Sequence, residues 1–140
     1  MNPKILIVDD DENIRTVLSK AFPGDYTVST APDGEAALEL IKSGKPDLVF
    51  LDIAMPGLSG FDVLARIKEA GLSPVVWMLT GEDELEIALK ALDLGAAGYQ
   101  TKPFDVVKLR EIAADVVSTE GGKKKHLPGD KPWSVKKSDE

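Results

Sequence analysis

Short apolar runs alternate along the chain with longer segments in which apolar residues recur every three or four positions. The short runs are typical of β-strands, and they lie at residues 4–8, 26–30, 48–51, 75–79 and 98–101. The longer segments are typical of helices with one apolar face, and they lie at residues 12–22, 35–42, 59–70, 82–94 and 106–117. This alternation predicts βαβ units, and so a doubly wound α/β fold with a five-stranded parallel sheet covered on both faces.

Apolar stripes on these helices predict the faces that pack against the sheet. The stripes with four members are Ile14, Val17, Leu18 and Ala21 in the first helix, Leu85, Ala88, Leu89 and Leu92 in the fourth, and Leu109, Ile112, Ala113 and Val116 in the fifth. The second strand differs from the other four, because its polar and apolar residues alternate. This alternation is typical of a more exposed edge strand.

The composition of the 140 residues fits one domain with a sizeable core. The net charge of -7 is uneven, because residues 1–118 carry -9 and residues 119–140 carry +2. An acidic body is poorly suited to binding a nucleic-acid backbone. No apolar run is long enough to span a bilayer, acidic residues near the N-terminus argue against a signal peptide, and there is no cysteine for a disulfide. We therefore expect a cytoplasmic protein with no membrane partner.

Four of the five predicted strands end in a chemically active side chain. Asp9 and Asp10 follow the first strand, Asp52 ends the third, and Thr80 and Lys102 follow the fourth and fifth. In a parallel sheet these ends lie along one edge, which is where doubly wound folds bind their ligands. We therefore expect the five side chains to meet in one crevice, although they are far apart in the sequence.

Three carboxylates in one crevice repel one another unless a cation neutralises them. Oxygen ligands with room for water suit Mg²⁺, and no histidine or cysteine stands among these residues to favour a softer metal. An ionised carboxylate beside Mg²⁺ can attack a phosphoryl group, with Lys102 offsetting charge on its oxygens and Thr80 donating its hydroxyl. These parts describe an aspartyl-phosphate site, in which Asp52 is the first candidate for the nucleophile.

The motifs around these residues resemble the receiver domains of two-component response regulators over residues 4–117. They are IVDD with Asp9 and Asp10, LDIAMPGLSG with Asp52, LT ending in Thr80, and GYQTKP with Tyr99, Lys102 and Pro103. Each motif alone is weak, but together they follow the family's order and approximate spacing. The resemblance implies a (βα)5 flavodoxin-like fold with strand order 2-1-3-4-5.

The resemblance further implies that Asp52 accepts a phosphoryl group from the phosphohistidine of a sensor histidine kinase or a histidine phosphotransfer protein. It implies that Mg²⁺ is held by Asp9, Asp10, Asp52 and the backbone carbonyl of Ala54. Such a protein is a signalling switch in a phosphorelay. It takes part in its own phosphorylation and dephosphorylation, and it is not an enzyme in the ordinary sense.

A conformational switch is also implied by the resemblance. Lys102 and Thr80 contact the phosphoryl oxygens, and Tyr99 turns inward when Thr80 is drawn toward them. The surface of the fourth helix, fifth strand and fifth helix then changes, and it binds a downstream target protein or a second copy of the chain. The peptide bond between Lys102 and Pro103 is expected to be cis, as in the family. Gln100 departs from the family, which usually has an aliphatic residue at this position.

Two other functions fit part of the pattern. A phosphohydrolase of the haloacid dehalogenase type also begins with an apolar strand and D-x-D, which Asp9 and Asp11 satisfy, and its nucleophile would be Asp9. That function leaves Asp52 without a role, and Thr80 and Gly81 stand where its later acidic pair is expected. A receiver-like interaction module that is never phosphorylated is the second alternative. Asp11 itself is expected to cap the first helix.

From residue 119 onward, Gly, Lys, Pro and Ser replace the apolar periodicity, which predicts a flexible basic tail. The expected organisation is therefore a receiver domain at residues 1–118 and a tail at residues 119–140. No output domain is expected after the fifth helix. This favours a stand-alone receiver, which either binds a target directly or relays its phosphoryl group to another protein.

Overall fold

The computed structural model describes residues 2–81 and 84–122. Within them, strands and helices alternate in the order that the sequence predicts. The strands are β1 (Lys4–Val8), β2 (Thr27–Ala31), β3 (Leu48–Asp52), β4 (Val75–Thr80) and β5 (Gly98–Thr101). The helices are α1 (Glu12–Ser19), α2 (Gly34–Gly44), α3 (Gly60–Glu69), α4 (Leu85–Asp93) and α5 (Val106–Gly122).

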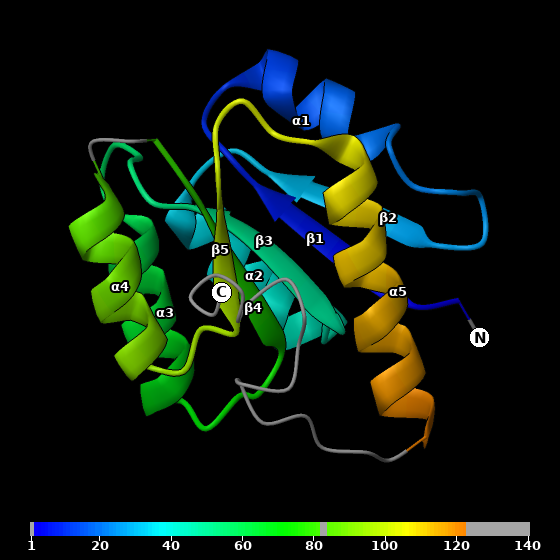
Figure 1. The fold of residues 1–140 in the computed structure, drawn as a ribbon. Helices are drawn as coiled ribbons and strands as arrows, with labels where there is room; N and C mark the ends of the chain where they lie inside the picture. Colours follow the sequence, from blue (N-terminus) through cyan, green and yellow to red (C-terminus); the bar gives the residue numbers. More distant parts are fainter. Residues whose placement is uncertain (1, 82–83, 123–140) are drawn as a thin grey trace, which may run out of the picture.

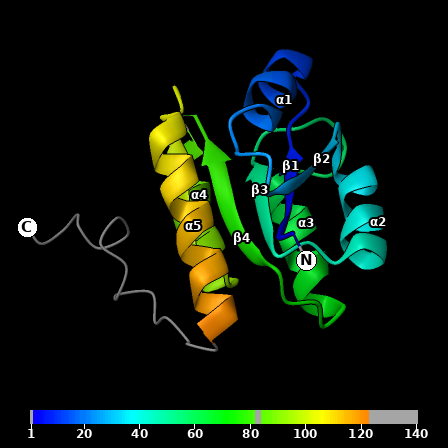
Figure 2. The same ribbon diagram turned by 90° about the vertical axis from the view of Figure 1, so that its right-hand side faces the viewer.

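The five strands form one parallel sheet in the order β2-β1-β3-β4-β5. Figure 1 shows the sheet between two layers of helices, and Figure 2 shows the same layers after a quarter turn. Helices α1 and α5 cover one face, and α2, α3 and α4 cover the other. The doubly wound, flavodoxin-like α/β fold and the strand order 2-1-3-4-5 are therefore confirmed.

Alternate side chains of the strands build two separate cores, as the two-residue repeat of a strand requires. Leu6 and Val49 point to the core beneath α2, α3 and α4, whereas Ile7 and Phe50 point to the core beneath α1 and α5. Strand β3 lies in the middle of the sheet, and all five of its residues are buried, including the charged Asp52 at its end. A buried carboxylate at the end of an apolar strand is costly without compensation, which draws attention to this edge.

Polar side chains at the helix starts hold the loops that leave this edge of the sheet. Asp11 caps α1 through a hydrogen bond of 2.9 Å from a backbone amide, as predicted. Asp33 caps α2 in the same way at 2.8 Å. Helix α3 begins with a capping box, in which the side chains of Ser59 and Asp62 each accept the other's backbone amide. Such caps stabilise the helix starts next to the site.

The face of α4 that packs on the sheet differs from the predicted one. Ala88 is buried as predicted, but its partner on that face is Ala91, while the exposed fractions of Leu85, Leu89 and Leu92 are 37%, 51% and 38%. The small alanines allow the helix to lie close to the sheet, so the leucine stripe falls beside the contact face instead of within it. The prediction failed because spacing alone does not distinguish a buried stripe from an adjacent exposed one.

Helices α1 and α5 end at other residues than expected. Helix α1 ends at Ser19 instead of residue 22, and Ala21 and Phe22 continue as buried turn residues beside the core. Helix α5 continues to Gly122, past the expected tail boundary at residue 119, because no proline or glycine interrupts it before Gly121. The rest of the expected tail, residues 123–140, lies outside the described residues. Within residues 2–81 and 84–122, no helix has the length and apolar character that a membrane span requires.

Candidate functional site

The parallel register brings the predicted strand ends to one edge of the sheet. Val8 of β1 pairs with Leu51 of β3, so Asp9 and Asp52 lie at the same level on neighbouring strands. On the other side, Asp52 pairs with Leu79 of β4, one residue before Thr80. Strand β5 follows next in the sheet, and Lys102 comes directly after it. The topology therefore accounts for the meeting of residues that are far apart in the chain.

Three carboxylates form a compact cluster at this edge. Asp9, Asp10 and Asp52 each offer an oxygen, and these oxygens lie within 4.8 Å of one another. Asp10 is exposed, whereas the exposed fractions of Asp9 and Asp52 are 0% and 1%. The cluster is thus open to solvent through Asp10 and closed beneath by the sheet.

The two buried carboxylates are only partly hydrogen-bonded to the described part of the chain. Asp9 Oδ1 accepts the Asp11 amide at 2.9 Å, but Asp9 Oδ2 and Asp52 Oδ1 have no hydrogen-bond partner among the described residues. Buried polar oxygens without partners are rare in folded proteins and call for an explanation. The donor set consists only of oxygens, which is the set that a hard divalent cation prefers. The residues present therefore fit a cation such as Mg²⁺.

Burial dominates the electrostatics of this cluster. It raises the pKa of Asp52 to about 7, and the negative charge of Asp9 adds to the rise, while the Lys102 ammonium lowers the value. Burial also raises the pKa of Asp9, although the hydrogen bond from Asp11 and the charge of Lys102 act in the opposite direction. The two buried carboxyl groups therefore resist ionisation together, and a bound cation would favour their charged forms.

Thr80 and Lys102 complete the edge of the site from β4 and β5. Thr80 is buried, and its Oγ1 donates a hydrogen bond of 2.8 Å to the Gly81 carbonyl. The Lys102 side chain is exposed, and its Nζ lies 6.0 Å from the centre of the Phe104 ring, within range of a cation–π contact. The backbone amide of Lys102 donates to the Thr80 carbonyl at 2.9 Å, and the peptide bond from Lys102 to Pro103 is cis.

Neighbouring positions of β5 face opposite sides of the sheet. Tyr99 pairs with Met78 and packs, half-buried, against the core beneath α2, α3 and α4. Gln100 pairs with Leu79, so it shares the face covered by α1 and α5, where it is also half-buried. Tyr99 is thus on the side of α4, whereas Gln100 is on the side of α5.

Two further residues contact the loops of the site, and neither could be identified from the sequence. Arg15 of α1 donates from Nη1 to the Asp9 carbonyl at 2.7 Å. Glu84, directly before α4, accepts the Gly81 amide on its Oε1 at 2.9 Å. Neither residue belongs to a motif, and both contacts depend on how a helix is seated beside a loop. The only sequence signal is that each of them follows an active strand end within a few residues.

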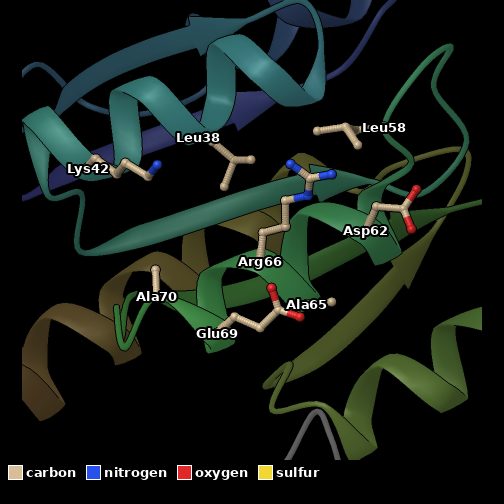
Figure 3. A pocket seen from close by; sticks show the side chains of 8 residues that line it. All are labelled: Leu38, Lys42, Leu58, Asp62, Ala65, Arg66, Glu69 and Ala70. Carbon is tan, nitrogen blue, oxygen red and sulfur yellow. The ribbon is translucent and has the colours of Figure 1, made fainter.

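Two cavities lie on the face of the sheet that α2, α3 and α4 cover, and the first of them is beside the carboxylate cluster. The first, of about 580 Å³, is formed by the loop after β3 and by α4, and Ala54 and Glu84 both line it. The second, of about 670 Å³, lies between α2 and α3 (Figure 3). Its lining residues are Leu38, Lys42, Leu58, Asp62, Ala65, Arg66, Glu69 and Ala70. The second cavity contains charges of both signs and none of the clustered carboxylates, so it is separate from the site.

The fold and this edge define a doubly wound α/β domain with a cation-type carboxylate site at the carboxyl end of its sheet. The sequence pattern of the response regulator receiver domain matches residues 5–114. This chain therefore belongs to the response regulator receiver domain family, which is a family of two-component signalling modules and not of classical enzymes.

Individual relatives agree with this family. The alkaline phosphatase synthesis transcriptional regulatory protein PhoP of Bacillus subtilis is 43% identical over 117 residues, which cover 83% of this chain and 48% of that protein. The sporulation initiation phosphotransferase F of Bacillus subtilis is 36% identical over 129 residues, which cover 91% of this chain and 96% of that protein. The chain thus spans about half of the first relative and nearly all of the second.

A solved structure shows the same fold. The REC domain of AraT, a response regulator from Geobacillus stearothermophilus, aligns with a TM-score of 0.80 and 32% sequence identity. The alignment covers 89% of this chain and 100% of that domain. Almost the whole described fold therefore corresponds to a complete receiver domain.

Proposed function

We propose that this chain accepts a phosphoryl group on Asp52 in a Mg²⁺-dependent reaction and passes the signal on through contacts with other proteins. One observation carries the proposal: the buried Asp52 carboxylate keeps an oxygen that no described residue hydrogen-bonds, next to the carboxylates of Asp9 and Asp10. Such an arrangement lowers stability, and perturbed groups of this kind cluster at functional sites. Membership of the receiver family supports the same assignment.

Mg²⁺ would be held by the carboxylates of Asp9, Asp10 and Asp52 and by the backbone carbonyl of Ala54. When bound, the ion supplies positive charge against the carboxylates and the phosphoryl oxygens. Two of the carboxylates have a buried oxygen without a hydrogen-bond partner in the described part of the chain, which supports this set of ligands. Arg15, through its hydrogen bond to the Asp9 carbonyl, would steady the loop that carries two of the ligands.

In the reaction, an Asp52 oxygen forms a bond to phosphorus while the bond from phosphorus to a histidine nitrogen of the donor breaks. The Lys102 ammonium, whose charge already acts on Asp52, offsets negative charge on the phosphoryl oxygens. Thr80 turns its hydroxyl from the Gly81 carbonyl to a phosphoryl oxygen. The new arrangement is favoured only by contacts that the phosphorylated state makes and the free state lacks.

The signal would leave the molecule through the surface of α4, β5 and α5. Tyr99 of β5 packs on the side of α4, where Leu85, Leu89 and Leu92 are exposed. Exposed apolar residues gathered on one helix suit a protein partner. The donor would be a sensor histidine kinase or a histidine phosphotransfer protein, and the receiving partner a target protein or a second copy of the chain.

We propose a relay in the cytoplasm as the form of this function, and one of the relatives supports the relay. The chain matches nearly the whole of a protein named a sporulation initiation phosphotransferase, which supports transfer of the phosphoryl group to another protein. Residues 1–118 would form the receiver. Residues 119–140 would form the basic tail, apart from the last helical residues up to Gly122.

The two alternative functions have less support. The phosphohydrolase needs Asp11 as the second acid of its D-x-D motif, but the Asp11 carboxylate caps α1. It also gives no part to Asp52, which belongs to the carboxylate cluster. The unphosphorylated interaction module gives no reason for the unpaired buried oxygens, and the experiment below separates it from the receiver.

Intact-mass spectrometry after incubation with Mg²⁺ and acetyl phosphate tests the proposal, with Asp52→Asn as the control. The expected result is one phosphoryl adduct on the native protein and none on the control or in samples without Mg²⁺. Steady release of inorganic phosphate that survives in Asp52→Asn but stops in Asp9→Asn would instead identify a phosphohydrolase. If no adduct and no phosphate release appear under any condition, the interaction module is the better account.

A further inference from the structure

The loop between β4 and α4 is fastened by a carboxylate that does not cap the helix after it. Glu84 stands directly before α4, but its side chain makes no capping bond to that helix. It reaches back instead, and its Oε1 accepts the Gly81 amide at 2.9 Å. The Glu84 amide in turn donates to the Gly81 carbonyl at 3.1 Å. Two hydrogen bonds therefore tie Glu84 to Gly81.

This fastening occupies the hydrogen-bond donors at the end of β4. The Thr80 hydroxyl donates to the same Gly81 carbonyl at 2.8 Å, and the Gly81 amide donates to Glu84. Thr80 lies one residue beyond Leu79, which pairs with Asp52 on the neighbouring strand. A phosphoryl group on Asp52 would need donors at this point, so it would compete with the acceptors that hold them in the free protein.

Glu84 also adds negative charge to the site. Burial and the charge of Asp9 are the main reasons that the pKa of Asp52 is raised, and the charge of Glu84 acts in the same direction. The Glu84 side chain lines the same cavity as Ala54, two residues after Asp52, and Lys90 lines that cavity as well. A phosphoryl group brings a charge of about -2, so Glu84 repels it more strongly than it repels the free carboxylate.

We propose that Glu84 is a positioning residue that holds Gly81, at the end of β4, in its unphosphorylated arrangement and opposes phosphorylation of Asp52. Its carboxylate acts as an internal anion on the Gly81 amide, and the phosphoryl group replaces it. Departure of Glu84 then releases the start of α4. This is the helix on which Leu85, Leu89 and Leu92 are exposed. The inference rests on the proposed function of Asp52, and the test below separates the two.

Two variants separate the effect of the Glu84 charge from the effect of its hydrogen bond to Gly81. Glu84→Gln keeps an oxygen that can accept the Gly81 amide but removes the charge, whereas Glu84→Ala removes both. Glu86→Gln is the matched control, because it removes one exposed charge two positions further along the chain, in the first turn of α4. None of these substitutions changes a residue of the carboxylate cluster.

The first measurement is amide hydrogen exchange at Gly81 in the unphosphorylated protein without Mg²⁺. Loss of its acceptor is expected to speed exchange in Glu84→Ala by about tenfold, while Glu84→Gln and Glu86→Gln stay close to wild type. The second measurement is the rate of adduct formation from acetyl phosphate with Mg²⁺. Both Glu84 variants are expected to react about three to ten times faster than wild type, with Glu84→Ala the faster of the two and Glu86→Gln unchanged.

The outcomes distinguish this inference from the proposed function. If wild type forms the adduct but all variants react at its rate, the role of Glu84 is wrong. If Gly81 exchange is the same in Glu84→Ala as in wild type, the fastening of the loop is wrong. A wild-type protein that never forms the adduct contradicts the function of Asp52, and Gly81 exchange still decides whether Glu84 holds the loop. Should Glu84→Ala fail to fold, the rate of Glu84→Gln decides alone.

Discussion

The placement of the Asp52 side chain is unfavourable for the stability of this fold. Its side chain is buried, one of its oxygens has no hydrogen-bond partner in the described structure, and the charge of Asp9 lies beside it. Lys102 offsets part of this repulsion from an exposed position. Replacement by an uncharged side chain of the same shape would relieve these costs, which makes Asp52 a site retained for chemistry at the expense of stability.

The pKa of Asp52 predicts how stability depends on pH when Mg²⁺ is absent. The unfolded chain loses this proton near the ordinary value of 3.8, whereas the folded protein keeps it up to about pH 7. The free energy of unfolding of wild type therefore falls as the pH rises between these values. Asp52→Asn lacks this proton, so its stability relative to wild type should grow by on the order of 2 kcal/mol between pH 5 and pH 8.

Urea unfolding of both proteins at a series of pH values measures this difference. Added Mg²⁺ should stabilise wild type more at pH 8 than at pH 5, because the ion competes with the proton for the same carboxylate. Asp52→Asn should show a weaker response to the ion at both pH values. Parallel stability curves for the two proteins across this pH range would contradict the assigned burial and charge of Asp52.

At the scale of elements, the start of α3 is packed directly against the end of β3. The Gly60 amide donates to the Ile53 carbonyl at 2.8 Å, and a Cβ atom on Gly60 would overlap the backbone carbonyl oxygen of Asp52. Glycine is needed here for close approach of two backbones. The capping box of Ser59 and Asp62 spans this glycine and stabilises the same helix start.

This contact predicts that Gly60→Ala is strongly destabilising. The added methyl group has no flexible neighbour to displace, so the free energy of unfolding should fall by about 2–4 kcal/mol. Gly24→Ala is the matched control, because nothing lies within 4 Å of the Cβ position there. Thermal or urea unfolding of the two variants measures the difference, and equal stability would contradict the close packing of α3 on β3.

Truncation of a leucine should affect stability much more in α5 than in α4. Leu109 of α5 is fully buried, so Leu109→Ala should lower the free energy of unfolding by about 3 kcal/mol. Leu89 of α4 is half exposed, so Leu89→Ala should lower it by less than about 1 kcal/mol. Denaturant unfolding compares the two directly. A large loss at Leu89 would mean that the leucine stripe of α4 is buried after all.

These elements also separate what the sequence could predict from what it could not. The predictions for the apolar stripe of α5 and for the buried strand β3 were correct, because burial of a whole face leaves a strong periodic signal in the sequence. The stripe of α4 was placed wrongly, since two alanines were enough to seat that helix on the sheet. The contact of Glu84 with Gly81 depends on the seating of the same helix, and it leaves no pattern in the sequence.

At the scale of the whole molecule, a parallel sheet turns scattered residues into one site. Each βαβ unit returns the chain to the same edge, so Asp9, Asp52, Thr80 and Lys102 arrive there from four strands in sequence. The position of this edge could be predicted because it follows from topology alone. The cavities between the helices could not be predicted, because they depend on how side chains of neighbouring helices fill the space between them.

The central claim is that Asp52, and no other residue, carries the phosphoryl group. Borohydride reduction of protein treated with acetyl phosphate and Mg²⁺ converts an aspartyl phosphate to homoserine, and tandem mass spectrometry of the peptides then locates it. We expect homoserine at the position of Asp52 alone, and only in samples that contained Mg²⁺. Homoserine at the position of Asp9, or at any other aspartate, would contradict it.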